Sequence, residues 1–154
     1  YKNIGGVNMQ ISSKFIIAVH LLAVIDYLGD NEKVTSNILA KSIGSNPVIV
    51  RNVMGNLKEF GIIDISQGKS GVLLTRKTSE ITFYDVYKAV ESVKEEGLFH
   101  FHENPNPECP IGSNIHKAMD IKLETIQQSM EEEMKKITIA DVLSDIMKEI
   151  KNIG

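Results

Sequence analysis

Apolar residues at three- and four-residue spacing predict a helix from about Ser13 to Leu28. The residues on its wide apolar face are Phe15, Ile16, Val19, Leu22, Ala23 and Ile25. Ser12 or Ser13 can serve as the N-cap of this helix. Gly29 is a suitable end, because glycine tolerates the backbone angles that follow a helix.

A short helix and a longer helix are predicted next, separated by a sharp turn. The short one is expected over Ser36–Ile43, with Thr35 as its N-cap and Gly44 at its end. The pair Asn46-Pro47 then predicts a new helix, since asparagine caps well and proline at the first helical position leaves no amide hydrogen unpaired. This helix is expected over Pro47–Phe60. Its apolar stripe consists of Val50, Val53, Met54 and Leu57.

Beyond Gly61 the apolar residues change from helical spacing to short continuous runs. Ile62–Ile65 and Val72–Leu74 are two such runs, and the segment between them contains Gly68 and Gly71. Short apolar runs on both sides of a glycine-containing loop predict a β-hairpin. Helix, turn, helix and hairpin in this order are the elements of a winged helix-turn-helix domain.

The second half of the chain is predicted to be helical apart from an irregular, proline-containing segment at residues 92–112. Capping boxes at Thr82 and at Thr138 each open a helix. The longest helix is expected over Ile111–Lys136. Its narrow apolar seam is typical of a dimerisation helix and consists of Ile115, Met119, Leu123, Ile126, Met130 and Met134. In the last helix the residues expected to be buried are Val142, Leu143, Ile146 and Ile150.

The predicted fold class is therefore mainly α with a small β-hairpin wing, a winged helix-turn-helix domain followed by a long dimerisation helix. Residues 1–8 are interpreted as a tag remnant or N-terminal extension. Residues 9–78 are expected to form the DNA-binding domain. Residues 79–110 would hold a linking helix and sensor loop, and residues 111–154 the dimerisation helices.

Charge is unevenly distributed along the chain. Residues 1–78 contain nine Lys/Arg against five Asp/Glu, whereas residues 79–154 contain eight against fifteen. A basic first half suits phosphate binding. The longest apolar stretch, Phe15–Ile25, is too short to span a membrane. Because no secretion signal is evident and Cys109 is the single cysteine, a cytoplasmic location is expected.

The N-terminal end of the Pro47–Phe60 helix carries side chains that can read bases. Arg51 can donate two hydrogen bonds to guanine, and Asn52 can pair with adenine. Lysines such as Lys41 are better suited to phosphates. The residues expected to contact double-stranded DNA are Lys14, Thr35, Ser45, Asn46, Val48, Ile49, Arg51, Asn52 and Lys58, with Gln67 and Lys69 in the wing.

Several stretches resemble the IscR–NsrR–CymR family of winged-helix regulators, often called the Rrf-two family. They are Ile11–His20, Asn46-Pro47-Val48 with Leu57, Phe60–Ile63 and Ile81–Val86. The segment His102–Gly112 resembles the YwnA-like branch. The resemblance covers nearly all of Met9–Ile150. It implies a homodimer joined by the long helix, repression of target promoters and a sensor region just before that helix.

The chain departs from the family pattern in two places. The family wing often reads Arg-Gly-x-x-Gly-Gly-Tyr, whereas residues 67–72 lack the arginine, one glycine and the tyrosine. The contacts of the wing with DNA are therefore left open. Cluster-binding members carry three cysteines in the sensor segment, and only Cys109 stands here, near the place of the third. Neither an iron–sulfur cluster nor another cofactor is expected.

Two other functions stay open. The reduced wing and the negative net charge favour a protein-interaction module that kept the fold and lost DNA binding. A metal- or thiol-responsive sensor could use Cys109 with His100, His102 and His116, although their spacing matches no known metal site and no metal is expected. Cys109 precedes a predicted helix, which would stabilise its thiolate and suits a redox sensor. No nucleophile, paired-carboxylate or phosphate-loop motif predicts an enzyme.

Overall fold

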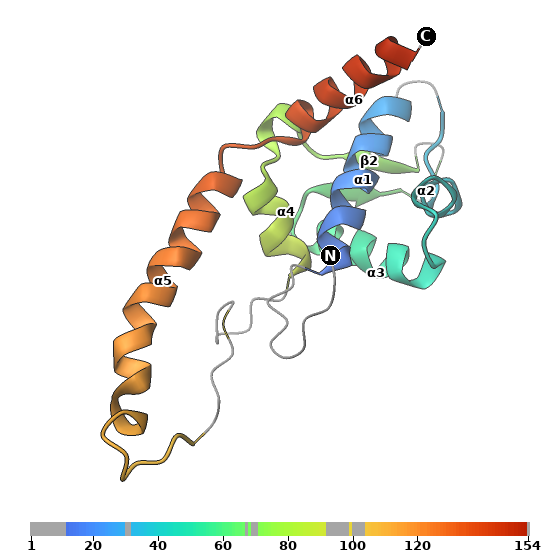
Figure 1. Cartoon of the computed structure of the whole chain (residues 1–154). Helices are drawn as coiled ribbons and strands as arrows, with labels where there is room; N and C mark the ends of the chain where they lie inside the picture. Colours follow the sequence, from blue (N-terminus) through green and yellow to red (C-terminus); the bar gives the residue numbers. More distant parts are fainter. Residues whose placement is uncertain are drawn as a thin grey trace. The chain divides into compact units, whose positions relative to one another are not determined.

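The computed structural model describes residues 12–29, 32–66, 68, 71–91, 99 and 104–153 (Figure 1). Contacts divide the chain into two compact units. The first, which we call the winged-helix unit, contains the described residues 12–91 together with 134–153. The second, the sensor unit, contains the described residues between 99 and 133. The predicted mainly helical class with one hairpin is confirmed.

Helix α1 (Ser13–Leu28) forms the centre of the winged-helix unit and packs against α2, α3, α4 and α6. Its buried residues are Phe15, Ile17, Ala18, Leu21, Leu22, Ala23 and Ile25. The helix is apolar nearly all round, so spacing alone could not select the buried side, and Ile16 on the predicted face is 66% exposed. The ring of Phe15 meets that of Phe83 edge-on, with centroids 5.3 Å apart.

The start of α1 is held by a residue distant in sequence. Ser12 occupies the predicted N-cap position, but its hydroxyl makes no capping bond to the helix. Instead, the backbone N–H and the hydroxyl of Ser12 both donate to Oε1 of Glu91, at 2.8 and 2.6 Å. Glu91 is the residue that ends α4, so the carboxylate ties the end of one helix to the beginning of another.

The two predicted helices of the helix-turn-helix are confirmed as α2 (Ser36–Ile43) and α3 (Pro47–Glu59), with Phe60 as the C-cap of α3 rather than its last residue. Thr35 caps α2 by accepting a hydrogen bond from the N–H of Ile38. The apolar stripe of α3 is buried as predicted. It comprises Val50, Val53, Met54 and Leu57, each at most 4% exposed.

The wing is an antiparallel pair of three-residue strands, β1 (Ile63–Ile65) and β2 (Val72–Leu74). Two such short strands are marginal alone, and here a third segment supports them. Val34, just before α2, forms a parallel bridge with Gly71. The N–H of Val72 donates to the carbonyl oxygen of Val34 at 2.9 Å. The wing is thereby attached to the beginning of the helix-turn-helix.

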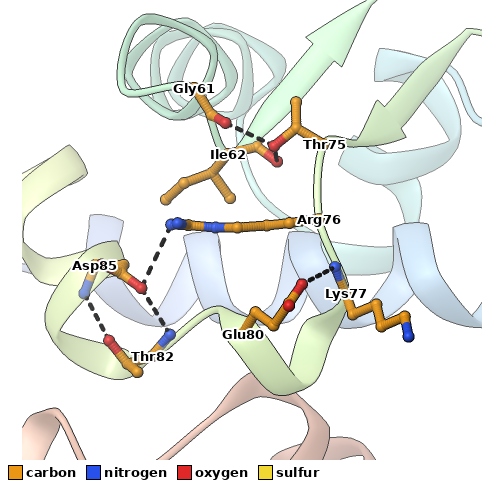
Figure 2. A network of polar contacts seen from close by, with 8 residues as sticks. All are labelled: Gly61, Ile62, Thr75, Arg76, Lys77, Glu80, Thr82 and Asp85. Carbon is orange, nitrogen blue, oxygen red and sulfur yellow. Dashed lines mark hydrogen bonds and ion pairs between the residues drawn. The ribbon is translucent and has the colours of Figure 1, made fainter.

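Polar contacts hold the exit of the wing against the start of α4 (Phe83–Val90), as Figure 2 shows. The hydroxyl of Thr75 donates to the carbonyl oxygens of Gly61 and Ile62, at 2.6 and 3.0 Å. Arg76 forms an ion pair with Asp85 at 3.4 Å, and Asp85 also completes the predicted capping box. This network joins the end of α3, the wing and α4 into one structure.

The chain returns to the winged-helix unit at α6 (Ile139–Ile153). The N–H of Phe83 donates to the carbonyl oxygen of Ile137, and that of Ile139 donates to Ile81. Ile139 is fully buried, but Ile146 and Ile150 are 42% and 51% exposed. The prediction that these two are buried is wrong, because only the first part of α6 meets the core.

The sensor unit contains a short 3-10 helix (Gly112–Asn114) and the 20-residue helix α5 (Ile115–Met134), whose last residue belongs to the winged-helix unit. The long helix thus begins four residues later and ends two residues earlier than predicted. None of the helices in the described ranges combines the length and apolar character that a bilayer-spanning segment requires.

We predict that Gly71→Ala detaches the wing. Gly71 has φ +70°, and an added Cβ would overlap the carbonyl oxygen of Val34. The left-handed backbone alone costs about 1–2 kcal/mol for a residue with a Cβ, and the overlap adds to it. A loss of at least about 2 kcal/mol in the free energy of unfolding is expected in urea titrations.

Gly68→Ala is the matched control, since its added Cβ would meet only the hydroxyl oxygen of the Ser66 side chain, at 3.3 Å. Equal stability of the two variants would contradict the attachment of the wing through Val34.

Candidate nucleic-acid interface

The turn between α2 and α3 places the start of α3 on the surface. Gly44 takes the left-handed conformation, with φ +66°, and its N–H donates to the carbonyl oxygen of Ala40. Asn46 then caps α3 as predicted, with its Oδ1 accepting from the N–H of Val48 at 2.8 Å. Pro47 follows at the first helical position. Local chemistry alone therefore fixes where α3 begins.

Most of the predicted DNA-contacting residues lie together in the turn and in the first two turns of α3. Val48 and Ile49 are 57% and 37% exposed. The other members of this group are Ser45, Asn46, Arg51 and Asn52, of which Ser45 is half-buried and the rest exposed. Lys58 is exposed in the last turn of α3. Gln67 and Lys69 lie outside the described residues.

A groove of about 490 Å³ runs beside α3, between the segment leading into α2 and the wing. Arg51 and Gly55 line it from α3, and Thr35 lines it at the start of α2. Its other lining residues are Lys33, Val34, Ser36, Met54, Ile65, Ser66, Gly71 and Val72. Sequence reasoning missed this groove, because it depends on the bridge between Val34 and Gly71. Lys14, in the first turn of α1, is exposed but does not line it.

Positive charge dominates the surface of the helix-turn-helix. Lys41, Arg51 and Lys58 are all exposed, and Glu59 is the one acidic residue between Ser36 and Phe60. Within the described ranges, none of these three cations makes an ion pair at 4.0 Å or less; the pairs found there include Arg76–Asp85 and Lys148–Asp145. Exposed cations without carboxylate partners can each neutralise a phosphate.

Cys109 lies in a tight loop at the start of the sensor unit and is half-buried. Its N–H donates to the carbonyl oxygen of Asn106, and its own carbonyl accepts from Ser113. An added Cβ at Gly112 would meet the backbone of Asn106 at 2.6 Å, so the loop closes only with glycine there. Backbone N–H groups of Gly112 and then Ile111 lower the pKa of the Cys109 thiol, because they stabilise the thiolate.

The predicted dimer seam of α5 is accessible in the single chain. Within α5 only Met134 is buried, while Met119 and Ile126 are 38% and 54% exposed. The remaining seam residues, Ile115, Leu123 and Met130, are half-buried.

The histidines considered with Cys109 are only partly described. His100 and His102 lie outside the described residues, and His116 is half-buried in the first turn of α5. In the part of the chain that the structure covers, no group of three or more His, Cys, Asp or Glu side chains could hold a metal ion.

The arrangement of α1–α3 and the wing matches that of known regulators. The Rrf2 family model, described as an iron-dependent transcriptional regulator, matches residues 11–145. YwnA of Bacillus subtilis (strain 168), whose name describes an HTH-type transcriptional regulator, is 38% identical over 137 residues, covering 89% of this chain and 99% of YwnA.

Solved structures agree with this assignment. One, whose title names a DNA-binding protein, has a TM-score of 0.69 and 32% identity over 84% of this chain and 98% of its own. IscR of T. potens shares the fold, with a TM-score of 0.64 and 20% identity over 89% of this chain and 88% of its own. The chain therefore belongs to the Rrf2 family of helix-turn-helix transcriptional regulators.

Proposed function

We propose that the chain acts as a homodimeric repressor that binds a two-fold-symmetric DNA site, with one α3 helix in each half-site. The observation that carries this proposal is the exposed start of α3 with Arg51 and Asn52, together with the exposed Lys41 and Lys58, which make no ion pair among the described residues. An α-helix fits the major groove, and dimers of this class read half-sites about 34 Å apart or a multiple of that. In this proposal Arg51 reads guanine, Asn52 reads adenine, and Lys58 binds phosphate.

DNA binding is tested by titrating the protein into a fluorescent genomic fragment that contains its own promoter, at two salt concentrations and with random competitor DNA. We expect binding that survives the competitor and weakens as salt increases. A reporter gene under the bound promoter then tests repression. Binding no tighter than to random DNA, together with a protein partner in pull-downs, would support the interaction-module alternative instead.

We predict that Arg51→Ala weakens specific binding by about 1–3 kcal/mol and relaxes base preference at one position of each half-site. Arg51 is exposed and makes no ion pair within the described ranges, so its removal leaves the fold intact. Competition titrations against single-base operator variants measure both effects.

Lys58→Ala is the matched control. It should weaken binding to all sequences alike and reduce the salt slope by about one per lost phosphate contact. If Arg51→Ala behaves in the same way, Arg51 contacts phosphate and the assigned role is wrong.

We predict that Leu123→Glu with Ile126→Glu converts a dimer into monomers. Both residues lie on the seam of α5, and the paired variant would set like charges against each other in a symmetric interface, which costs several kcal/mol. The dimer dissociation constant should rise at least about 100-fold in sedimentation equilibrium.

Ile121→Glu serves as the control for charge alone. Ile121 is 72% exposed and lies off the seam on the same helix, so this variant should remain dimeric. Monomers of the wild type at micromolar concentration would contradict the proposal of a dimer.

A second candidate function is regulation by thiol chemistry at Cys109, favoured by the two backbone N–H groups that stabilise its thiolate. We predict that its alkylation rate rises with pH around a midpoint below that of an unstructured cysteine peptide. The direction follows because a lowered pKa gives more thiolate at a given pH.

The same protein unfolded in urea is the control for the alkylation rates. Alkylation or oxidation should also change operator affinity in the wild type and leave Cys109→Ser unchanged. A wild-type midpoint equal to that of the unfolded chain, or an unaltered affinity after full alkylation, would remove this second candidate.

A further inference from the structure

The packing of α3 determines which residues face away from the protein. At 3.6 residues per turn, the side of the helix opposite the buried stripe is a line of four residues spaced four, three and four apart. They are Val48, Asn52, Gly55 and Glu59, and all four are exposed. Arg51 and Lys58 lie on one flank of this line, and Ile49 lies on the other. We call the first three residues, Val48, Asn52 and Gly55, the outer line of α3.

Val48 gives the outer line an apolar end. Its side chain is 57% exposed in the first turn of the helix, four residues before Asn52 and on the same face. A single exposed apolar side chain on a protein surface needs no special explanation. Val48, however, lies on the outer side of α3 in its first turn. In helix-turn-helix proteins this end of the recognition helix enters the major groove and contacts the bases.

No backbone angle or close contact in the described part of the chain requires glycine at position 55. Unlike Gly44, Gly61 and Gly71, it has an ordinary helical backbone, and a Cβ added there would meet nothing within 4 Å. Glycine at an exposed position inside a helix costs about 1 kcal/mol relative to alanine. A contact with a bound partner at short range would offset this cost, since glycine lets the helix backbone approach closely.

The charges around the outer line indicate which kind of partner fits. Arg51 and Lys58 flank it on one side, Lys41 is exposed on the preceding helix α2, and Glu59 is the one acidic residue between Ser36 and Phe60. An exposed apolar side chain on a helix that also carries exposed cations fits the major groove of DNA, which presents phosphates at its edges. Within that groove the C5-methyl of thymine is the apolar group on the base edges.

We propose that Val48 is a specificity-determining residue that contacts the C5-methyl of a thymine in each half-site. This inference rests on the proposed function, and it assigns a base to a side chain that carries no hydrogen-bonding group. In the same arrangement Asn52 reads an adenine one turn further along α3, and Gly55 leaves room for the helix to lie against the base edges.

The test removes only the methyl group. Each thymine of a footprinted half-site is replaced in turn by deoxyuridine, which keeps every hydrogen-bonding group of the base. At one position per half-site the wild type should bind about fourfold more weakly, the effect of losing contact with one methylene-sized group. Val48→Ala should bind the thymine operator about fourfold more weakly and should no longer distinguish thymine from uracil at that position.

Ile49→Ala is the matched control, because Ile49 is an exposed apolar residue in the same turn but lies on the flank. It should keep the discrimination between thymine and uracil at the position that Val48→Ala loses. Melting curves of both variants check that α3 remains folded. Gly55→Ala should raise the melting temperature by a few degrees and still weaken operator binding.

The outcomes separate this inference from the function on which it rests. If the wild type binds the operator specifically but tolerates uracil at every position, the inference is wrong and the proposed function stands. If Val48→Ala keeps the discrimination, or leaves DNA binding unchanged, another residue contacts the methyl group and the assignment is overturned. If the wild type shows no specific binding, both proposals fail.

Discussion

The burial of one apolar stripe on α3 is the constraint on which the exposed surface of this helix depends. Val50 and Leu57, one at each end of this stripe, are fully buried against the rest of the winged-helix unit. Burying a side chain of this size stabilises the fold by about 1.5–3 kcal/mol. A rotation of α3 by one residue would expose part of the stripe and bury polar side chains such as Asn52. The core therefore determines which side chains of α3 are exposed.

The position of the wing depends in part on its contact with Val34. The hairpin has only two short strands, and its link to Val34 fixes it beside α3. Gly71 makes this link through a left-handed backbone that a side chain would disfavour. This link forms one wall of the groove that Arg51 and Gly55 line from α3, since Val34 and Gly71 both line it.

Features set by hydrogen bonds between near neighbours in the chain were predictable from the sequence, and features set by contacts between distant residues were not. The cap of α3 by Asn46 was predictable, because the hydrogen bond that it makes reaches only two residues along the chain. The start of α1 at Ser13 was predicted as well, but the partner of Ser12 was not, since Ser12 binds a carboxylate 79 residues away. The groove escaped prediction for the same reason, as its walls are joined by a bridge between Val34 and Gly71.

The spacing of apolar residues did not identify the buried side of a helix that is apolar nearly all round. Helix α1 is apolar on nearly every side, so the pattern could not show that Ile17 is buried and Ile16 exposed. On α6 the pattern is clear, yet Ile146 lies beyond the part of the helix that meets the core. An apolar residue on the correct face is buried only where a neighbouring element extends far enough to cover it.

Helix α4 is where both covalent connections to the sensor unit meet the winged-helix unit. The chain leaves after Glu91, the C-cap of α4, whose carboxylate accepts hydrogen bonds from Ser12 at the start of α1. It returns through Ile137, which accepts a hydrogen bond from the N–H of Phe83 at the beginning of α4. Because α4 packs against both α1 and α3, the residues at the two connections are continuous in packing with the helices that hold α3 in place.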